Sequence, residues 1–290
     1  MVWASVGWGG ARVAALNAEN WPKLMLAQGL RGVGSGEIGA CANSLRGAVA
    51  SLGCEVFGAQ HCCARTGESS VNRDDIAKSN EVIAARLMGA TDAEGFPIEK
   101  AWVSAAPVRF DADWRGLNAD AERGTEVRLL WTPEILYLRF VARYRSISVF
   151  PDADARGWRD HLWDRDVCEV FLQPDATQVR RYLEFEVAPN GFWIDLGIGP
   201  GEKHDLRSGM RRRVGIDEAA KRWTAVLALP MKSLTERFDA AGVWRVNFFR
   251  VEGDAEPRFY SAWRATGTPQ PNFHVPEVFG RLVFEGAGGK

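Results

Sequence analysis

The sequence contains no apolar run of the roughly eighteen residues that a membrane-spanning helix requires. Its start at Met1 also lacks a basic segment followed by a short apolar core, which is the pattern of a secretory signal. We therefore expect no membrane partner. These features do not indicate in which cellular compartment the protein acts.

The sequence also has no marked excess of positive or negative charge. The 36 Lys and Arg residues are balanced by 37 Asp and Glu residues, which leaves a net charge of −1. The basic run Arg211-Arg212-Arg213 is interpreted as a solvated strand or loop edge, because a nucleic-acid interface usually needs a larger basic surface. We expect no nucleic-acid partner.

Cysteines are few and unevenly placed. Four of the five precede residue 70, their number is odd, and none has the C-x-x-C spacing of a structural zinc site. The sequence thus predicts no disulfide framework, and His61 beside Cys62 is a weak metal candidate. Cys168 is interpreted as a small buried hydrophobe. The five are Cys41, Cys54, Cys62, Cys63 and Cys168.

Common catalytic motifs are absent, including G-x-S-x-G, H-E-x-x-H and a phosphate-binding glycine loop. A glycoside hydrolase needs two carboxyl groups about 5 to 9.5 Å apart. Glu184 and Glu186 share a face of one predicted strand, and Glu169 could join them. A hydrolase therefore stays open as an alternative, although we expect no enzyme.

The first part of the chain is poorly patterned. Residues 1–70 are rich in Gly, Ala and Ser and show little alternation. Residues 74–88 carry spaced apolar side chains between a candidate cap, Asn72, and Gly89, which favours a short amphipathic helix. We predict an extension over residues 1–88 and a folded domain over residues 89–290.

After Gly89 the chain reads as short strands separated by turns rich in Gly, Pro, Asp and Asn. This spacing favours an all-β fold, a two-sheet antiparallel β-sandwich. Asn190-Gly191 predicts a tight hairpin, and residues 230–234 predict a helical turn. Strands are expected at 106–110, 125–131, 135–144, 167–172, 182–188, 191–196, 210–214, 222–229, 244–251, 259–262 and 280–284.

Most tryptophans lie in or beside these strands and are expected to be core residues. They are Trp102, Trp131, Trp193, Trp223, Trp244 and Trp263. Trp163 differs, because it lies in a polar loop rich in Asp just before a strand in which Glu169 and Phe171 share one face. An indole beside a carboxylate suits a sugar, which presents both C–H faces and hydroxyls.

Three motifs in order resemble the family 9 carbohydrate-binding modules found on bacterial glycoside hydrolases. The first is W-x-x-D-x-x-E-x-F at residues 163–171. The second is the pair of strand segments at 125–131 and 136–138, and the third is P-x-x-F-G-x-L at 276–282. The resemblance covers about residues 97–286. It implies a jelly-roll-like sandwich that binds a monosaccharide, an oligosaccharide or a chain end of xylan or cellulose without catalysis, outside the cell or in the periplasm.

The resemblance also implies a site. Trp163 matches one wall of the family's aromatic clamp, and Phe273 stands where the family has a second tryptophan. Glu169 matches a carboxylate that bonds sugar hydroxyls. Glu186 stands where the family has an arginine. The remaining candidates are Arg250, which would restore a positive charge, and Asn272, which is preferred over Gln270 as a ligand-binding amide.

Two cofactor alternatives stay open. The resemblance allows calcium, for which Asp160, Asp164 and Asp166 are weak candidates because hard cations prefer clustered oxygens. Related sandwiches bind haem, for which Met210 and His204 are candidate ligands, with His161 or His274 as a second. Neither is the preferred interpretation.

Overall fold

The computed structural model describes residues 80–286. These residues belong to one compact unit, residues 71–290. The metal candidate at His61 and residues 74–79 of the predicted helix lie outside the described residues.

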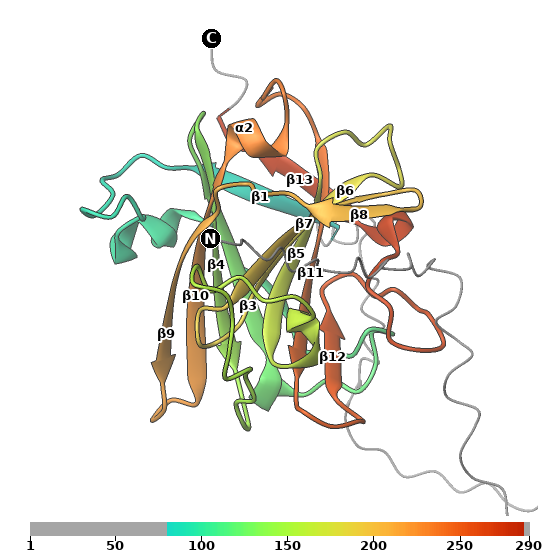
Figure 1. Ribbon diagram of the computed structural model, residues 1–290. Helices are drawn as coiled ribbons and strands as arrows, with labels where there is room; N and C mark the ends of the chain where they lie inside the picture. The colour runs from blue at the N-terminus through green and yellow to red at the C-terminus, as the bar shows by residue number, and fades with distance from the viewer. Residues whose placement is uncertain (1–79, 287–290) are drawn as a thin grey trace, which may run out of the picture. The chain divides into compact units, whose positions relative to one another are not determined.

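The described domain is mostly β (Figure 1). Neighbouring strands follow the order β8-β7-β6-β5-β11-β13-β1-β3-β4-β10-β9, while β12 pairs with β11 and β2 with β3. The strands are β1 Glu81–Arg86, β2 Val108–Phe110, β3 Thr125–Trp131, β4 Ile135–Arg143, β5 Val167–Gln173, β6 Tyr182–Val187, β7 Trp193–Gly199, β8 Glu202–Asp205, β9 Arg211–Asp217, β10 Arg222–Pro230, β11 Trp244–Glu252, β12 Phe259–Ala262 and β13 Gly280–Phe284.

Strand β1 joins the two halves of this fold. It pairs in parallel with β13 on one side and with β3 on the other, and Figure 1 shows β1 in cyan beside β13 in red. The β prediction is therefore confirmed, but the prediction of two separate antiparallel sheets is corrected to one curled, mixed sheet. The helix predicted at 74–88 is wrong over residues 81–86, because Val82, Ala84 and Ala85 are buried in this strand.

Short helical segments connect the strands. None of the helices within residues 80–286 is both long and apolar enough to cross a bilayer. The predicted turn at residues 230–234 is present as α2, which follows β10 directly. The segments are α2 Met231–Leu234, η2 Glu99–Ser104, η3 Ala121–Arg123, η4 Leu162–Asp164 and η5 Pro276–Val278.

The main core fills the inside of the curled sheet. Alternate side chains of β5 and β11 point into it, including Cys168, Val170 and Phe248, and they pack against Leu129 and Trp223 from the other half. Five of the six tryptophans expected to be core are buried, and Trp263 packs against the core as a partly buried residue. Cys168 is buried and free, as expected.

A second apolar cluster lies on the opposite face of β5, β6, β7 and β11. It contains Phe171, Ile194, Phe249 and Phe273, with Trp163 packed at its margin. Successive side chains of a strand point to opposite faces. The residues between the core side chains of β5 and β6 therefore line this second face, which we call the outer face, and the predicted site residue Glu169 is among them.

The hairpin between β6 and β7 shows why local sequence was a good guide to the strands. Gly191 has a φ of 84°, which glycine adopts without strain, and its amide donates to the carbonyl of Ala188. Strand β8 was missed because its four residues, Glu202–Asp205, are all exposed and carry no apolar alternation.

Candidate functional site

Three glutamates meet on the outer face. Glu169 of β5 pairs with Glu186 of β6, and Phe171 pairs with Glu184. One carboxylate oxygen of each glutamate lies within 4.8 Å of the others. We call these residues the glutamate cluster. The register of two neighbouring strands produces it, because alternate residues of each strand point to the same side.

The glutamate cluster is buried and poorly paired. Glu169 and Glu184 are 2% exposed and Glu186 is 0% exposed. Glu169 Oε1, Glu184 Oε2 and both carboxylate oxygens of Glu186 have no hydrogen-bond partner. Burial, followed by the charge of Glu184, raises the pKa of Glu169 well above its usual value. Burial and the charges of Glu169 and Glu184 do the same to the pKa of Glu186.

Two basic side chains lie near the glutamate cluster without pairing with it. The charges of Lys203 and Arg258 partly offset the rise in the pKa of Glu169. Both also contact Trp163, since Lys203 Nζ lies 3.9 Å from the centre of its ring and Arg258 Nη1 donates to its carbonyl oxygen at 2.7 Å. The sequence analysis missed both residues, because they come from β8 and the loop before β12 and match no local motif.

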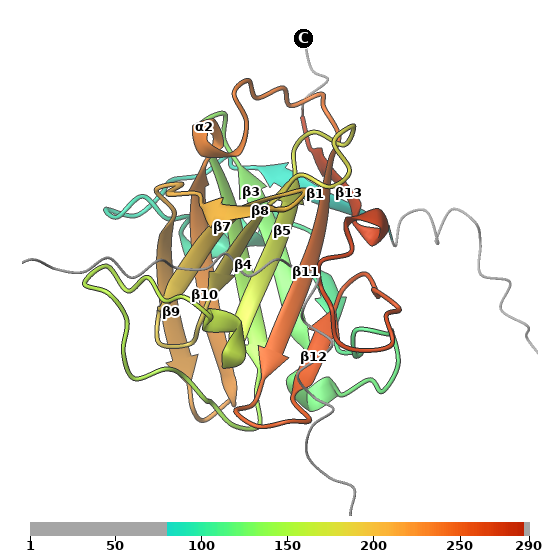
Figure 2. The same ribbon diagram turned by 45° about the vertical axis from the view of Figure 1, so that its right-hand side comes forward.

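Trp163 lies in η4, which contacts β6 and shortly precedes β5, the strand labelled in Figure 2. His161, the residue just before η4, adopts a left-handed backbone with φ 56°, and its ring lies 4.8 Å from that of Trp163. Trp163 is partly exposed, in contrast to the buried Leu162 next to it. Its indole is therefore one of several large, partly exposed aromatic groups at the margin of the outer face.

The other predicted wall, Phe273, also lies on the outer face. It is buried and stacks on Phe249 with ring centres 4.2 Å apart, so one side of its ring is already covered. Asn272 beside it is exposed and accepts a hydrogen bond from the His274 backbone. A hydrogen bond of 2.7 Å joins Nδ1 of the His274 ring to the Tyr182 hydroxyl oxygen.

Arg250 does not join this face. It is completely buried on the core side of β11, opposite Cys168. Its guanidinium donates to the carbonyl of Arg143 at 2.7 Å and pairs with Glu252 at 2.9 Å. The prediction that Arg250 supplies the positive charge beside Glu169 and Glu186 is thus corrected, because strand alternation turns it away from them.

The calcium candidates do not gather either. Within residues 80–286, the glutamate cluster is the group of acidic residues whose oxygens come close enough to share an ion. Asp160 and Asp164 flank the exposed His161 ring at 3.9 and 3.6 Å. Asp166 instead turns inward and accepts a hydrogen bond from the Gly253 amide.

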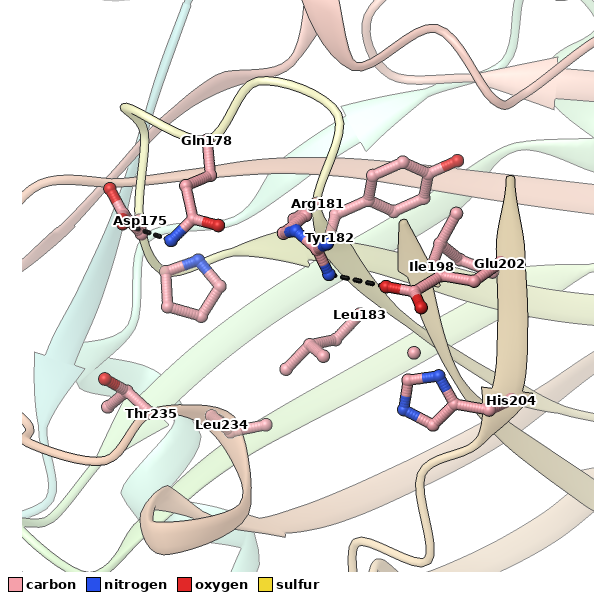
Figure 3. A pocket seen from close by; sticks show the side chains of 12 residues that line it. Asp175, Gln178, Arg181, Tyr182, Leu183, Ile198, Glu202, His204, Leu234 and Thr235 are labelled. Carbon is pink, nitrogen blue, oxygen red and sulfur yellow. Dashed lines mark hydrogen bonds and ion pairs between the residues drawn. The ribbon is translucent and has the colours of Figure 1, made fainter. Parts of the chain in front are cut away.

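The haem candidates are also dispersed. Met210 is buried in the main core, and His274 contacts Tyr182. His204 lines a separate pocket of about 280 Å³ (Figure 3). Leu183 of this pocket lies on the core side of β6, opposite Glu184 and Glu186, so the pocket is not the outer-face site. An ion pair between Arg181 and Glu202 borders it (Figure 3).

Asp166 gives a test of the buried polar network beside the site. Burial raises the pKa of Asp166 to about 6, so the folded protein binds this proton more tightly than the unfolded chain, whose Asp has a pKa near 3.8. The stability that this protonated carboxyl contributes is fully present below about pH 4 and is lost as the pH rises through 6. The loss lowers the free energy of unfolding by about 3 kcal/mol. Asp166→Asn, which keeps an acceptor for the Gly253 amide, is expected to gain stability relative to the parent between pH 4 and pH 8.

Urea unfolding of both proteins at pH 4, 6 and 8 checks this expectation. The glutamate cluster is present in both proteins, so its own titration cancels in the comparison. Parallel stability profiles over this range would contradict the role of Asp166.

The comparisons with known proteins bear on the fold. No family model matches the sequence. A carbohydrate-binding module of family 9 from Caldicellulosiruptor kristjanssonii, solved with cellotriose, superimposes with a TM-score of 0.53 and 12% identity, covering 70% of this chain and 93% of the module. The domain has the fold of a family 9 carbohydrate-binding module. The resemblance predicted from the three motifs is confirmed at this level.

Two further proteins are similar to this chain. A "putative carbohydrate-binding protein" from Bacteroides uniformis superimposes with a TM-score of 0.58 and 17% identity, over 71% of this chain and 99% of that protein. An "Extracellular protein" from Arthroderma benhamiae is 23% identical over 177 residues, which is 55% of this chain and 78% of the relative.

Proposed function

We propose that the domain binds a saccharide without catalysing a reaction, on the outer face beside Trp163. The observation that carries the proposal is the position of this partly exposed indole at the margin of a face that also holds the exposed side chains of Lys203 and His274. An aromatic ring next to donors and acceptors suits the C–H faces and hydroxyls of a sugar ring. The sugar would take the place of the Lys203 side chain on the indole.

The family 9 fold supports this proposal. The Caldicellulosiruptor kristjanssonii module was solved with cellotriose and also with glucose, the latter superimposing with a TM-score of 0.51 at 12% identity over 71% of this chain and 96% of the module. Glucose and cello- or xylo-oligosaccharides are therefore the first ligands to test. The curated relative named as extracellular favours a role outside the cell.

The burial of the glutamate cluster weighs against the hydrolase alternative. A glycosidase must bring a glycosidic bond between two carboxyl groups about 5 to 9.5 Å apart. Glu169 and Glu184 are only 2% exposed and Glu186 is not exposed at all, so a sugar ring has no path between them in this conformation. Binding at the surface beside Trp163 requires no such path.

Trp163→Ala is expected to weaken saccharide binding by about tenfold or more while lowering the free energy of unfolding by less than about 1.5 kcal/mol. A partly exposed side chain contributes less packing than a core tryptophan, whereas loss of the ring removes the stacking surface. Calorimetry with cellotriose and xylotriose, together with urea unfolding, measures the two effects separately.

Two variants serve as controls for that test. Trp163→Phe keeps a flat ring and should retain part of the affinity. Val103→Ala removes an exposed apolar side chain of η2 and should change neither quantity. Unchanged affinity in Trp163→Ala, in a protein that binds one of these sugars, would remove Trp163 from the site.

A further inference from the structure

Lys203 places a positive charge directly on the proposed saccharide site. Its Nζ atom lies 3.9 Å from the centre of the Trp163 ring. Lys203 pairs in register with Ile198, which packs against the apolar cluster of the outer face, so its side chain points to that face. All four residues of β8 are exposed, and a ligand can therefore reach the ammonium group.

This ammonium group has no carboxylate partner among the described residues. No ion pair within residues 80–286 includes Lys203. The neighbouring residue of β8, Glu202, points to the opposite face of the sheet and pairs with Arg181. The charge of Lys203 is therefore available to a negatively charged ligand.

Other ionisable groups of the outer face do not take over this pairing. Burial and the charges of neighbouring glutamates raise the pKa values of Glu169 and Glu186 well above the usual value, which favours the uncharged form of both. The second cation beside the indole, Arg258, is only 13% exposed and pairs with Glu256 at 3.0 Å. Lys203 thus differs from Arg258 in being both exposed and unpaired.

The position of Lys203 bears on the chemistry of the sugar. A neutral sugar that displaced Lys203 from the Trp163 ring would remove a contact between cation and aromatic face without replacing it. A sugar with an anionic group would cover the indole and also pair with the displaced ammonium. Lysine acts as a point charge and does not require the planar geometry that arginine reads, so a carboxylate and a sulfate both suit it.

We propose that the site beside Trp163 binds an acidic saccharide, whose carboxylate or sulfate group pairs with Lys203. This inference rests on the proposed function and adds the class of sugar to it. A carboxylate at C6, as in a uronic acid, projects from the edge of the sugar ring and leaves the C–H face free to stack on the indole. Lys203 is then the residue that determines specificity for the acidic sugar.

The test compares cellotriose with β-1,4-linked triglucuronate, which differ only at C6, by calorimetry on the full-length chain at low ionic strength. The triglucuronate is expected to bind about fivefold more tightly, because its carboxylate gains a charge-assisted contact at an exposed lysine. Added salt should remove most of this difference, because it screens exposed charges. Cellotriose carrying 6-sulfate groups, titrated in parallel, distinguishes a sulfate from a carboxylate as the preferred group.

Variants assign the preference to Lys203. Lys203→Gln should lower the affinity for triglucuronate to that for cellotriose, whereas the affinity for cellotriose should stay equal or rise, because a competitor for the indole is lost. Lys203→Arg keeps the charge and should keep the preference. Lys100→Gln, at an exposed lysine of η2, should change neither affinity. Trp163→Ala should weaken the binding of both sugars, because they share the site.

Four outcomes would overturn the proposal. Cellotriose binding as tight as or tighter than that of both acidic saccharides would remove the acidic class and leave the proposed function standing. A preference for triglucuronate that survives in Lys203→Gln, or triglucuronate binding that survives in Trp163→Ala, would show that the anion binds elsewhere. Failure of the parent protein to bind any of the three saccharides would contradict the proposed function as well.

Discussion

Removal of residues 71–88 is expected to abolish cooperative folding of the β domain. A chain covering residues 71–290 contains β1, whereas a chain starting at Gly89 lacks it. Loss of β1 would expose backbone groups along both β13 and β3, because β1 pairs with each of them. It would also remove the buried side chains of Val82, Ala84 and Ala85 and so open the core.

Urea unfolding followed by near-ultraviolet circular dichroism distinguishes the two chains. We expect a single transition for residues 71–290 and none for residues 89–290. Two point variants provide a matched control within the strand. Ala84→Asp places a charge in the core and should destabilise strongly, whereas Ile83→Asp, at a position 43% exposed, should be tolerated better. A cooperative transition in the chain that starts at Gly89 would refute the bridging role of β1.

Trp131→Ala is expected to lower the free energy of unfolding by about 3 to 5 kcal/mol, the usual range for a truncated core tryptophan. Trp131 ends β3, where it pairs with Leu136 of β4 and Arg86 of β1. Its ring packs edge-on against Phe238 and Phe284 at 5.6 Å, and its indole N–H donates to the Glu285 carbonyl. The side chain therefore supports the junction that β1 forms.

Chemical denaturation of Trp131→Ala and Trp163→Ala under one set of conditions compares a core position with a surface position. Trp131→Phe should lose less stability than the alanine variant, because it keeps an aromatic ring but not the N–H donor. Sugar affinity, measured where the Trp131 variants are folded, should not change. Equal destabilisation at Trp131 and Trp163 would contradict the difference in their environments.

The core tryptophans and most strands could be predicted from the sequence, because both depend on local alternation. Trp102 and Trp223 are buried as expected, and the Asn190-Gly191 turn joins β6 to β7. The prediction of a helix at residues 74–88 is wrong over β1 for a specific reason. Its spaced apolar residues fit a helical period, but the parallel partners of β1 lie 45 and 200 residues away in the sequence.

The candidate site was only partly predictable. Trp163, Glu169 and Phe273 were identified, and all three lie on the outer face. Arg250 was assigned to that face although it alternates with Phe249, which pairs with Glu169. It therefore shares the core side of β11 with Phe248 and Glu252, and Glu252 neutralises it. Strand period alone would have indicated this placement.

The sequence by itself determined which residues form most of the strands and which side chains of a strand share a face, because these properties repeat every two residues. Only the tertiary structure decided that β1 bridges β13 and β3. It also placed Glu184 and Glu186 beside Glu169 and brought Lys203 and Arg258 to Trp163. Strand order and register arise from contacts between distant segments, and these contacts leave no local pattern for the sequence to reveal.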